Sequence, residues 1–290
     1  MRYLACVPLL LLLSSCAYQE MEVSVCFTGQ KNCSRFIDGF HQAQCAFYDL
    51  DTQFFQNHVA GSQVLLFEKN YQGFEDVQDV EPVDSRGLMH HKFCVQGQEV
   101  WVGSMNPTEN GMYRNDNNVL VLRDSHLADY YRSILVHLHN RSKAVEKAGR
   151  SSYVEAMMCQ QTCRDRIIWE IRNARSSVHF MIFTFTDMST AVALLDAHAR
   201  GISVEGVVEK RSASHTIRDL LAYQGLDVEY DSNPAVMHHK VFIIDNRTVI
   251  TGSYNPTKSA EERNDENIIV LKSERIAREY LEEYRRVSGN

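Results

Sequence analysis

Residues 237–245 read Met-His-His-Lys-Val-Phe-Ile-Ile-Asp, and residues 89–92 carry the same Met-His-His-Lys. Each copy continues with Gly-Ser-x-Asn-Pro-Thr, at residues 103–108 and 252–257. Each then reads Arg-Asn-Asp, followed by Asn117-Asn118 in the first copy and Glu266-Asn267 in the second. His238 follows His90 by 148 residues and Gly252 follows Gly103 by 149. The chain therefore contains a duplication of a unit too long for a solenoid repeat.

The apolar pattern predicts a similar architecture for both copies. In the second copy, we expect helices over residues 164–174, 190–200 and 212–223, and strands over 178–185, 202–208, 226–230, 241–244 and 248–251. In the first copy, we expect strands over residues 45–50, 64–67, 91–95 and 100–102. That copy is shorter between Phe67 and Met89, where the second fits an additional helix and strand. Each copy closes with an amphipathic helix, near residues 126–138 and 276–287.

This alternation predicts an α/β fold of two similar halves. Each half is expected to be a mixed β-sheet flanked by helices, and the halves are expected to pack about a pseudo-twofold axis with one active site between them. The polar and charged residues 141–152 are the expected linker. The first repeat is then expected over residues 16–140 and the second over residues 153–290.

The N-terminus has the layout of a secretory signal. Arg2 precedes an apolar run over residues 3–13, and small residues lead to Cys16. The run is shorter than the roughly 20 residues that a membrane-spanning helix needs, and its end resembles the lipobox of bacterial lipoproteins. We therefore expect a signal peptide over residues 1–15 and lipidation of Cys16. The protein would then be exported and anchored to the cell envelope, at the outer membrane or the periplasmic face if the cell has two membranes. An ordinary signal peptide and an uncleaved anchor are the alternatives.

Six cysteines remain beyond Cys6 and Cys16. Equivalent places in the two repeats are occupied by Cys26 with Cys33 and by Cys159 with Cys163. An exported protein favours disulfides, so one local bridge per repeat is expected. By contrast, Cys45 and Cys94 lie in apolar runs and are expected to be buried free thiols. A zinc site at Cys159 and Cys163 is disfavoured because no further ligands stand at a recognisable spacing.

The repeated residues are those that a phosphate-handling site needs. On a strand, His238 and Lys240 point to one face while His239 points to the other, so His239 and its counterpart His91 are expected to be packed. Two imidazoles that face one phosphate permit a two-step displacement, in which one attacks phosphorus and the other protonates the leaving oxygen. Positive charge would come from Lys92 and Lys240, and neutral hydrogen bonds to the phosphate from Ser104, Asn106, Ser253 and Asn255. Such a site needs no metal and no cofactor.

The pattern His-x-Lys-x4-Asp with a downstream Gly-Ser-x-Asn resembles the signature of the phospholipase D superfamily. The resemblance covers nearly all of the chain beyond the predicted leader, and residues 238–245 match the pattern completely. It implies two sheet-and-helix halves around one active site, and hydrolysis or transfer of a phosphodiester through a phosphohistidine. It also adds Asp245 and Glu266 to the expected catalytic residues, because the family places at the position of Glu266 a residue that orients the catalytic histidine.

The first copy departs from the family pattern at two positions. It reads Gln96-Gly97 where the second has Asp245, and Asn117 where the second has Glu266. We therefore expect His238 to have the support of a carboxylate and His90 to lack it. Such a carboxylate fixes the tautomer that attacks, so His238 is the expected nucleophile and His90 the expected acid. Many members of the family are described with the opposite assignment.

The substrate is less narrowly indicated than the chemistry. A lipid anchor would place the enzyme beside phospholipid head groups, and a formal net charge of −7 disfavours a protein that coats nucleic acid. Hydrolysis of a phospholipid to phosphatidic acid and a head-group alcohol is the first hypothesis. A metal-independent endonuclease acting on DNA or RNA is the second, and a phosphatidyl transferase or a non-catalytic phosphate binder is the third. No obligate protein partner is expected.

Overall fold

The two repeats fold into two β-sheets with the same strand order. The computed structural model describes residues 22–29, 33–141, 145–146, 148–159 and 161–289. In these residues the first sheet has the order β1 (Glu22–Phe27), β7 (Asn118–Arg123), β6 (Glu99–Gly103), β5 (Lys92–Gln96), β2 (Gln44–Phe47), β3 (Gln63–Phe67) and β4 (Val80–Val83). The second sheet has the order β8 (Gly149–Ser151), β9 (Val154–Met158), β15 (Asn267–Lys272), β14 (Thr248–Gly252), β13 (Lys240–Ile244), β10 (Ser177–Ile182), β11 (Ser203–Val208) and β12 (Asp227–Tyr230). Apart from the edge strand β8, the strands correspond one to one.

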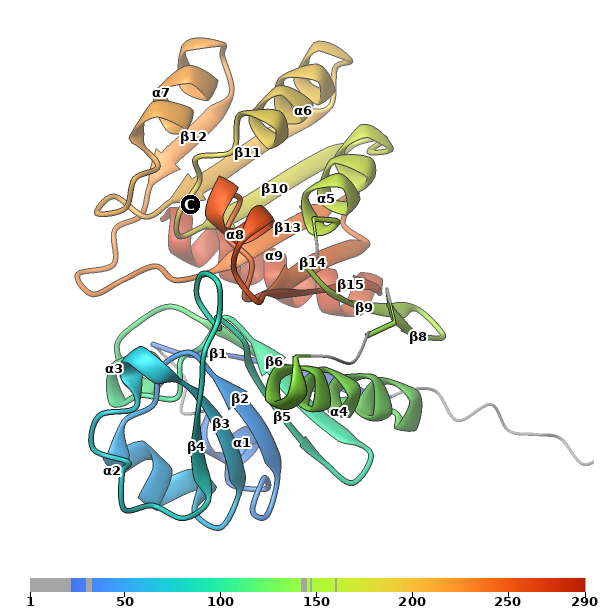
Figure 1. Ribbon diagram of the computed structural model, residues 1–290. Coiled ribbons are helices and arrows are strands. Elements are labelled where there is room, and N and C mark those ends of the chain that lie inside the picture. The colour runs from blue at the N-terminus through green and yellow to red at the C-terminus, as the bar shows by residue number, and fades with distance from the viewer. Residues whose placement is uncertain (1–21, 30–32, 142–144, 147, 160, 290) are drawn as a thin grey trace, which may run out of the picture.

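Both sheets are mixed, as the sequence predicts. Strands β2, β3 and β4 run parallel to one another, as do β10, β11 and β12. The remaining pairs are antiparallel. All five residues of β13 are buried, which is typical of a strand covered on both faces. The α/β class and the two similar halves are therefore confirmed (Figure 1).

Helices cover the outer face of each sheet. On the first sheet they are short: α1 (Ser34–Ile37), α2 (Thr52–Phe54), the π-helix η1 (Phe55–Val59) and the 3-10 helix η2 (Glu68–Asn70). On the second sheet they are longer: α5 (Cys163–Arg172), α6 (Met188–Ala199) and α7 (His215–Tyr223). Each Asn-Pro-Thr segment leads into one short helix, α3 (Glu109–Tyr113) or α8 (Lys258–Glu262). The threonine hydroxyl caps that helix, since Thr108 accepts from the amide of Gly111 and Thr257 from the amide of Ala260.

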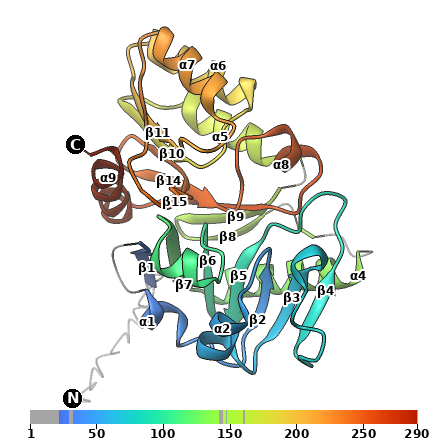
Figure 2. The same cartoon turned by 90° about the vertical axis from the view of Figure 1, so that its left-hand side faces the viewer.

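The last helix of each repeat packs in the seam between the sheets. These are α4 (Ser125–Asn140) and α9 (Glu274–Ser288), as the sequence predicts. A single core of buried apolar side chains contains residues of both helices and of the inner faces of both sheets. Helix α4 also contacts β9 of the second sheet, and α9 contacts β1 of the first. The halves therefore share one core (Figure 2).

Two expectations about the elements were wrong in part. Between Phe67 and Met89 the first half has no helix counterpart to α7 in the described residues, as expected, but it does contain β4, which pairs parallel with β3. The segment Val80–Val83 was missed because Pro82 and two acidic neighbours break the apolar alternation. The predicted linker 141–152 contains β8, which pairs with β9, so the second sheet begins inside it.

Three disulfides join cysteines among the described residues. The bridges Cys26–Cys33 and Cys159–Cys163 lie at equivalent places in the two repeats, as expected. The expectation of free thiols at Cys45 and Cys94 was wrong, because these two are bridged. Their strands are antiparallel neighbours that place Cys45 directly opposite Cys94, a register that the apolar runs alone do not reveal.

The predicted signal peptide and the lipidation at Cys16 lie outside the described residues. Within the part of the chain that the structure describes, we find no helix with the length and apolar character required to cross a bilayer.

The bridge between β2 and β5 is expected to stabilise the fold more than the local bridges. It closes a loop of 49 residues, against 4 for Cys159–Cys163. Loop-closure entropy then predicts losses of about 4 and about 2 kcal/mol of unfolding free energy, respectively. The variants Cys45→Ala/Cys94→Ala and Cys159→Ala/Cys163→Ala, compared by urea denaturation, test this order. Equal losses would contradict it.

Candidate active site

The two histidine segments are held by backbone hydrogen bonds that cross between the halves. The amide of His90 donates to the carbonyl of Asp265 at 2.9 Å, and the amide of Asp265 donates to Leu88 at 2.8 Å. In the same way, the amide of His238 donates to Asp116 at 2.8 Å, and the amide of Asp116 donates to Val236 at 2.8 Å. These contacts form two isolated parallel bridges, Met89 with Asp265 and Asp116 with Met237. Each histidine therefore lies against the polar segment of the opposite repeat.

Because each histidine lies against the opposite repeat, the acceptors at Nδ1 of the two histidines are the reverse of those expected. The carboxylate of Glu266 lies 2.9 Å from Nδ1 of His90, whereas the expectation assigned it to His238. The amide oxygen of Asn117 lies 2.9 Å from Nδ1 of His238, which also lies 3.1 Å from the carbonyl oxygen of Ser104. The error arose from assuming that each orienting residue serves the histidine of its own repeat. His90 has the carboxylate and His238 has a neutral acceptor.

The serines of the Gly-Ser pairs hold the orienting residues. The hydroxyl of Ser253 donates to Glu266 at 2.5 Å, and that of Ser104 donates to Asn117 at 3.1 Å. Both serines have an exposed fraction of 0%. The expectation of direct phosphate contact was therefore wrong for Ser104 and Ser253, because both side chains are buried and their hydroxyls donate to the residues that orient the histidines.

The glycine before each serine permits a close approach of two strands. A Cβ atom at Gly103 would lie 2.0 Å from the carbonyl oxygen of Asn118, and one at Gly252 would lie 2.3 Å from that of Asn267. No side chain fits at such a distance, so the repeated glycine is a packing requirement.

The asparagines of the Gly-Ser-x-Asn blocks are half-buried at the end of the same loops. The side-chain oxygen of Asn255 accepts from the amide of Thr184 at 3.3 Å, which leaves its Nδ2 to donate to a phosphate oxygen. The side-chain oxygen of Asn106 is buried without a hydrogen-bond partner among the described residues. Direct phosphate contact remains a prediction for both.

Both lysines are buried and their ammonium groups are anchored. The Nζ of Lys92 donates to the carbonyl of His90, and that of Lys240 donates to the carbonyl of His238, each at 2.7 Å. Burial lowers the pKa of Lys92 to about 7. Burial, with the charge of Lys92, holds the pKa of Lys240 well below its usual value. A bound anion would reverse these shifts, so the pair is suited to a phosphate.

The histidines are held in their neutral form. Burial and the charges of the two lysines lower the pKa of both His90 and His238 well below the ordinary value. Burial raises the pKa of Glu266 to about 7 against the charge of Lys92. At neutral pH each imidazole therefore has a lone pair, and the hydrogen bond at Nδ1 directs that lone pair to Nε2. This is the form that a nucleophile or a base requires.

Asp245 does not belong to this constellation. It lies in the turn between β13 and β14 with a φ of +53°, and its carboxylate accepts from the backbone amides of Arg175, Ser176 and Ser177 at 2.9, 2.7 and 3.2 Å. These hydrogen bonds hold its pKa below the usual range although partial burial opposes them. The expectation that Asp245 is catalytic was wrong, because its place in the strand directs it to the far end of the sheet.

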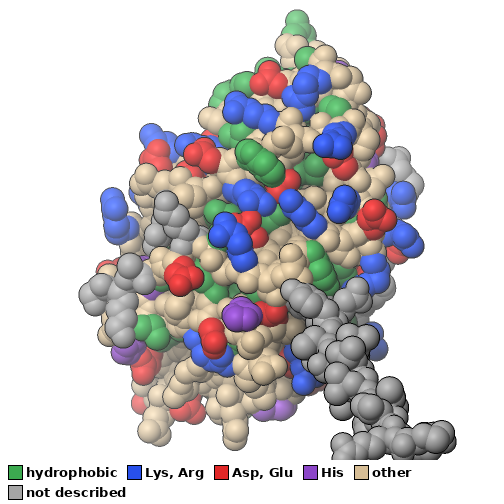
Figure 3. Space-filling model, turned by 90° about the vertical axis from the view of Figure 1, so that its right-hand side faces the viewer, with side chains coloured by type: hydrophobic (Ala, Val, Ile, Leu, Met, Phe, Trp, Pro, Cys, Tyr) green, Lys and Arg blue, Asp and Glu red, His purple; other side chains and the backbone are tan. Residues whose placement is uncertain are grey.

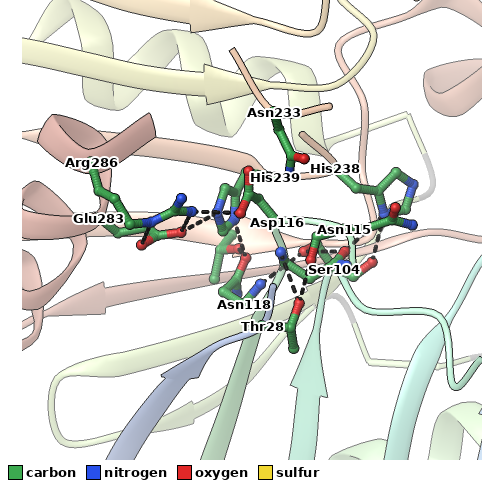
Figure 4. A network of polar contacts seen from close by, with 12 residues as sticks. Thr28, Ser104, Asn115, Asp116, Asn118, Asn233, His238, His239, Glu283 and Arg286 are labelled. Atoms are coloured by element: carbon green, nitrogen blue, oxygen red, sulfur yellow. Dashed lines mark hydrogen bonds and ion pairs between the residues drawn. The ribbon is translucent and has the colours of Figure 1, made fainter. Parts of the chain in front are cut away.

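His91 and His239 are fully buried on the opposite face of their strands, as expected. His239 contacts Glu283 of α9 at 3.0 Å, and Arg286 contacts both Glu283 and Asp116 at 2.6 Å. Figure 4 shows Arg286 and Glu283 of the second repeat beside Asp116 of the first, the residue whose carbonyl accepts from the amide of His238. An equivalent ion pair joins Arg141 to Asp265 at 2.8 Å.

Sequence reasoning missed several residues that shape the site. The ring of Tyr48 lies 4.8 Å from that of His90, and the ring of Phe183 lies 4.7 Å from that of His238. Each ring also lies 5.0 Å from the ammonium of the neighbouring lysine. Both aromatic residues follow directly after equivalent strands, β2 and β10, so alignment of the repeats could have indicated them. Asn117 was noted only as a departure from the pattern.

The two histidines do not line the pocket between the halves, and no candidate metal cluster is found among the described residues. A pocket of about 830 Å³ is lined by residues of both halves, Asp84, Arg141 and Asp265 among them, but not by His90 or His238. In the described residues, no group of three or more His, Cys, Asp or Glu side chains is placed to hold a metal ion.

A family model and several curated proteins of the same family match this chain. The family model described as "Cardiolipin synthase, PLD-like domain" matches residues 3–139 and again residues 167–288. A phospholipase D of Rickettsia conorii is 33% identical over 142 residues, which cover 48% of this chain and 71% of that protein. The human mitochondrial cardiolipin hydrolase is 31% identical over 129 residues, which cover 44% of this chain and 51% of that protein.

A solved structure matches the arrangement of both halves. The phosphatidylserine synthase of Haemophilus influenzae Rd KW20 aligns with a TM-score of 0.67 over 90% of this chain and 85% of that chain. The identity is 11%, so this likeness concerns the fold alone.

The contacts of Glu266 and Asp245 predict different effects for two conservative variants, a loss of activity at Glu266 and a loss of stability at Asp245. Glu266→Gln removes the negative charge that would stabilise the cationic ring of His90 formed on attack, and we expect turnover of bis(p-nitrophenyl) phosphate to fall by about 10² to 10⁴ with the fold intact. Asp245→Asn weakens only the turn, and we expect a loss of about 1 to 2 kcal/mol of stability with kcat unchanged. Paired kinetics and thermal denaturation test both. A large loss of kcat in Asp245→Asn would restore a catalytic role for that residue.

Proposed function

Since the chain belongs to the phospholipase D superfamily, we propose that it hydrolyses a phospholipid phosphodiester through a phosphohistidine intermediate. The family model matches it twice, once in each repeat. The products would be phosphatidic acid and the head-group alcohol.

One observation carries this proposal. Two neutral imidazoles from opposite halves are each oriented at Nδ1 by an acceptor from the other half, and a lysine lies beside each of them. A nucleophile and an acid that approach one phosphate from two sides require this arrangement.

The contact between Glu266 and His90 supports the roles that we propose for the two histidines. Nε2 of His90 attacks phosphorus, and the P–O bond to the head-group alcohol breaks. The carboxylate of Glu266 stabilises the positive charge that develops on the ring. His238, whose pKa rises when the anionic substrate is bound, gives its proton to the leaving oxygen. Water then attacks phosphorus, His238 takes the proton back, and the P–N bond to His90 breaks.

The surroundings of the histidines favour a lipid over a nucleic acid. The aromatic rings of Tyr48 and Phe183 border the pair, and the chain as a whole is acidic, with a net charge of −7. The names of two relatives, a phospholipase D and a cardiolipin hydrolase, point the same way.

We also propose that the protein is exported and anchored to the envelope by a lipid on Cys16. All six cysteines beyond Cys16 form disulfides, which is typical of proteins in oxidising compartments. Such an anchor would hold the site beside its substrate.

Parallel assays on phospholipid vesicles and single-stranded DNA test the reaction. We expect the full chain to release head group in the presence of EDTA, and the His90→Ala and His238→Ala variants to release none. Cleavage of DNA without release of head group would establish the nuclease alternative and overturn the proposal.

Trapping the intermediate tests the assignment of the nucleophile. A phosphatidyl ester of p-nitrophenol needs no acid for its first step, because p-nitrophenolate is stable enough to leave without a proton. With this substrate, His238→Asn should give a burst of p-nitrophenolate and accumulate a phosphatidyl group bonded through phosphorus to Nε2 of His90, detectable by mass spectrometry without acid treatment. His90→Asn is the matched control and should show no burst. A phosphatidyl group on His238 in that control would reverse the roles.

A further inference from the structure

Helix α5 presents an exposed tryptophan among cationic side chains. Trp169 is 52% exposed, whereas Trp101 is 1% exposed. The guanidinium carbon of Arg166 lies 5.3 Å from the centroid of the Trp169 ring, and the ammonium of Lys272 lies 6.0 Å from it. Such contacts hold the ring in place without removing it from solvent.

A shallow hollow lies beside this ring. Its volume is about 300 Å³, and it is lined by Arg164, Asp165, Ile168, Trp169, Arg172 and Ser189. Arg172 is exposed and has no ion pair within the described ranges. Its guanidinium is therefore free to donate to an external anion, and a planar fork of N–H groups suits a phosphate.

The carboxylate partners of this face are mostly buried, and Arg166, whose side chain is 21% exposed, lies between Glu155 and Glu170. Arg166 and Lys272 share Glu170, whose side chain is 7% exposed, and Lys272 itself is 45% exposed. Exposed acids here include Asp165, at 76%, and Asp196, which follows Val192 by four residues on α6. Figure 3 shows Lys and Arg side chains gathered in the middle of this face beside hydrophobic ones. Arg172 and Lys272 are the exposed cations beside Trp169, and Arg172 has no carboxylate partner in the described part of the chain.

Apolar side chains of α6 extend the exposed surface. Met188 and Val192 are 49% and 43% exposed, and their spacing of four residues places them on one side of the helix. Ser189 of α6 lines the same hollow as Trp169, and Val192 follows it by three residues. Apolar groups rimmed by cations mark an interaction surface.

We propose that this surface, formed by Arg166, Trp169, Arg172, Val192 and Lys272, docks on an anionic phospholipid bilayer. Tryptophan is favoured at the depth of the head groups, where its ring is shielded and its N–H remains hydrated. Arginine and lysine beside it are attracted by anionic head groups. The docking surface contains no residue of the histidine site, so it goes beyond the hydrolysis proposed above.

Tryptophan emission of the full chain tests this docking without any turnover. Since Trp101 is buried, the emission that acrylamide quenches belongs to Trp169, and Trp169→Phe is the blank. We expect phosphatidylglycerol vesicles to shift the emission to the blue, to protect it from acrylamide, and to allow quenching by brominated acyl chains. Phosphatidylcholine vesicles should do none of these. The N-terminal segment is common to every variant and cancels in the comparison.

Charge variants test the basic rim. Arg172→Gln/Lys272→Gln should weaken binding to phosphatidylglycerol by about fivefold for each charge removed. The matched control Arg123→Gln/Arg278→Gln removes two exposed charges elsewhere and should bind like the unaltered chain. Hydrolysis of a soluble short-chain phospholipid should be the same in all of them, which separates docking from the proposed reaction.

Three results would overturn the proposal. The first is emission from Trp169 that does not respond to anionic vesicles. The second is an equal loss of binding in the control variant, which would show attraction by overall charge. The third is a shift of Trp169 emission by single-stranded DNA and not by phosphatidylglycerol, which would make the surface a nucleic-acid interface.

Discussion

The site depends on two short backbone bridges that cross between the repeats. Each pairs the residue before a histidine with the aspartate of the opposite repeat, Met89 with Asp265 and Met237 with Asp116. Because the next residue along the chain is Glu266 or Asn117, the same bridge that positions a histidine also brings the acceptor for its Nδ1. The ion pairs from Arg141 and Arg286 hold these aspartates. Separation of the halves would therefore remove the orientation of both histidines together.

Burial keeps the two histidines neutral, and it makes the positive charges of the two lysines unfavourable until an anion binds. Two lysines and two histidines lie within reach of one another's charge, and burial lowers the pKa of each. A bound phosphodiester supplies the negative charge that this arrangement lacks, so the substrate is expected to stabilise the protein as well as to react. The carboxylate of Glu266 contacts His90 and partly offsets the positive charge of both lysines.

The two repeats have kept one fold while their chemistry has diverged. The strand order is the same in both sheets, and the glycine, serine and threonine of each motif have the same structural tasks. The orienting residue differs, as does the ion network around the second packed histidine, where Glu283 contacts His239. The outer helices differ as well, since α5 and α6 of the second half carry the exposed apolar and basic surface. A shared core thus permits separate changes at the acceptor position and on the outer face.

Periodicity and repetition within the chain were sufficient to predict the α/β class, the two halves, the closing helices, the local disulfides and the residues His90, Lys92, His238 and Lys240. These features follow from neighbours along the chain, or from the comparison of one repeat with the other. The partner of Glu266, the bridge between Cys45 and Cys94, the burial of Ser104 and Ser253 and the remote place of Asp245 could not be predicted in this way. Each depends on which strands become neighbours and on which half faces which. The contacts of the serines span 13 positions, and those of Cys45, Asp245 and Glu266 span 49, 69 and 176. Local pattern specifies the elements, but packing across the seam specifies which groups meet.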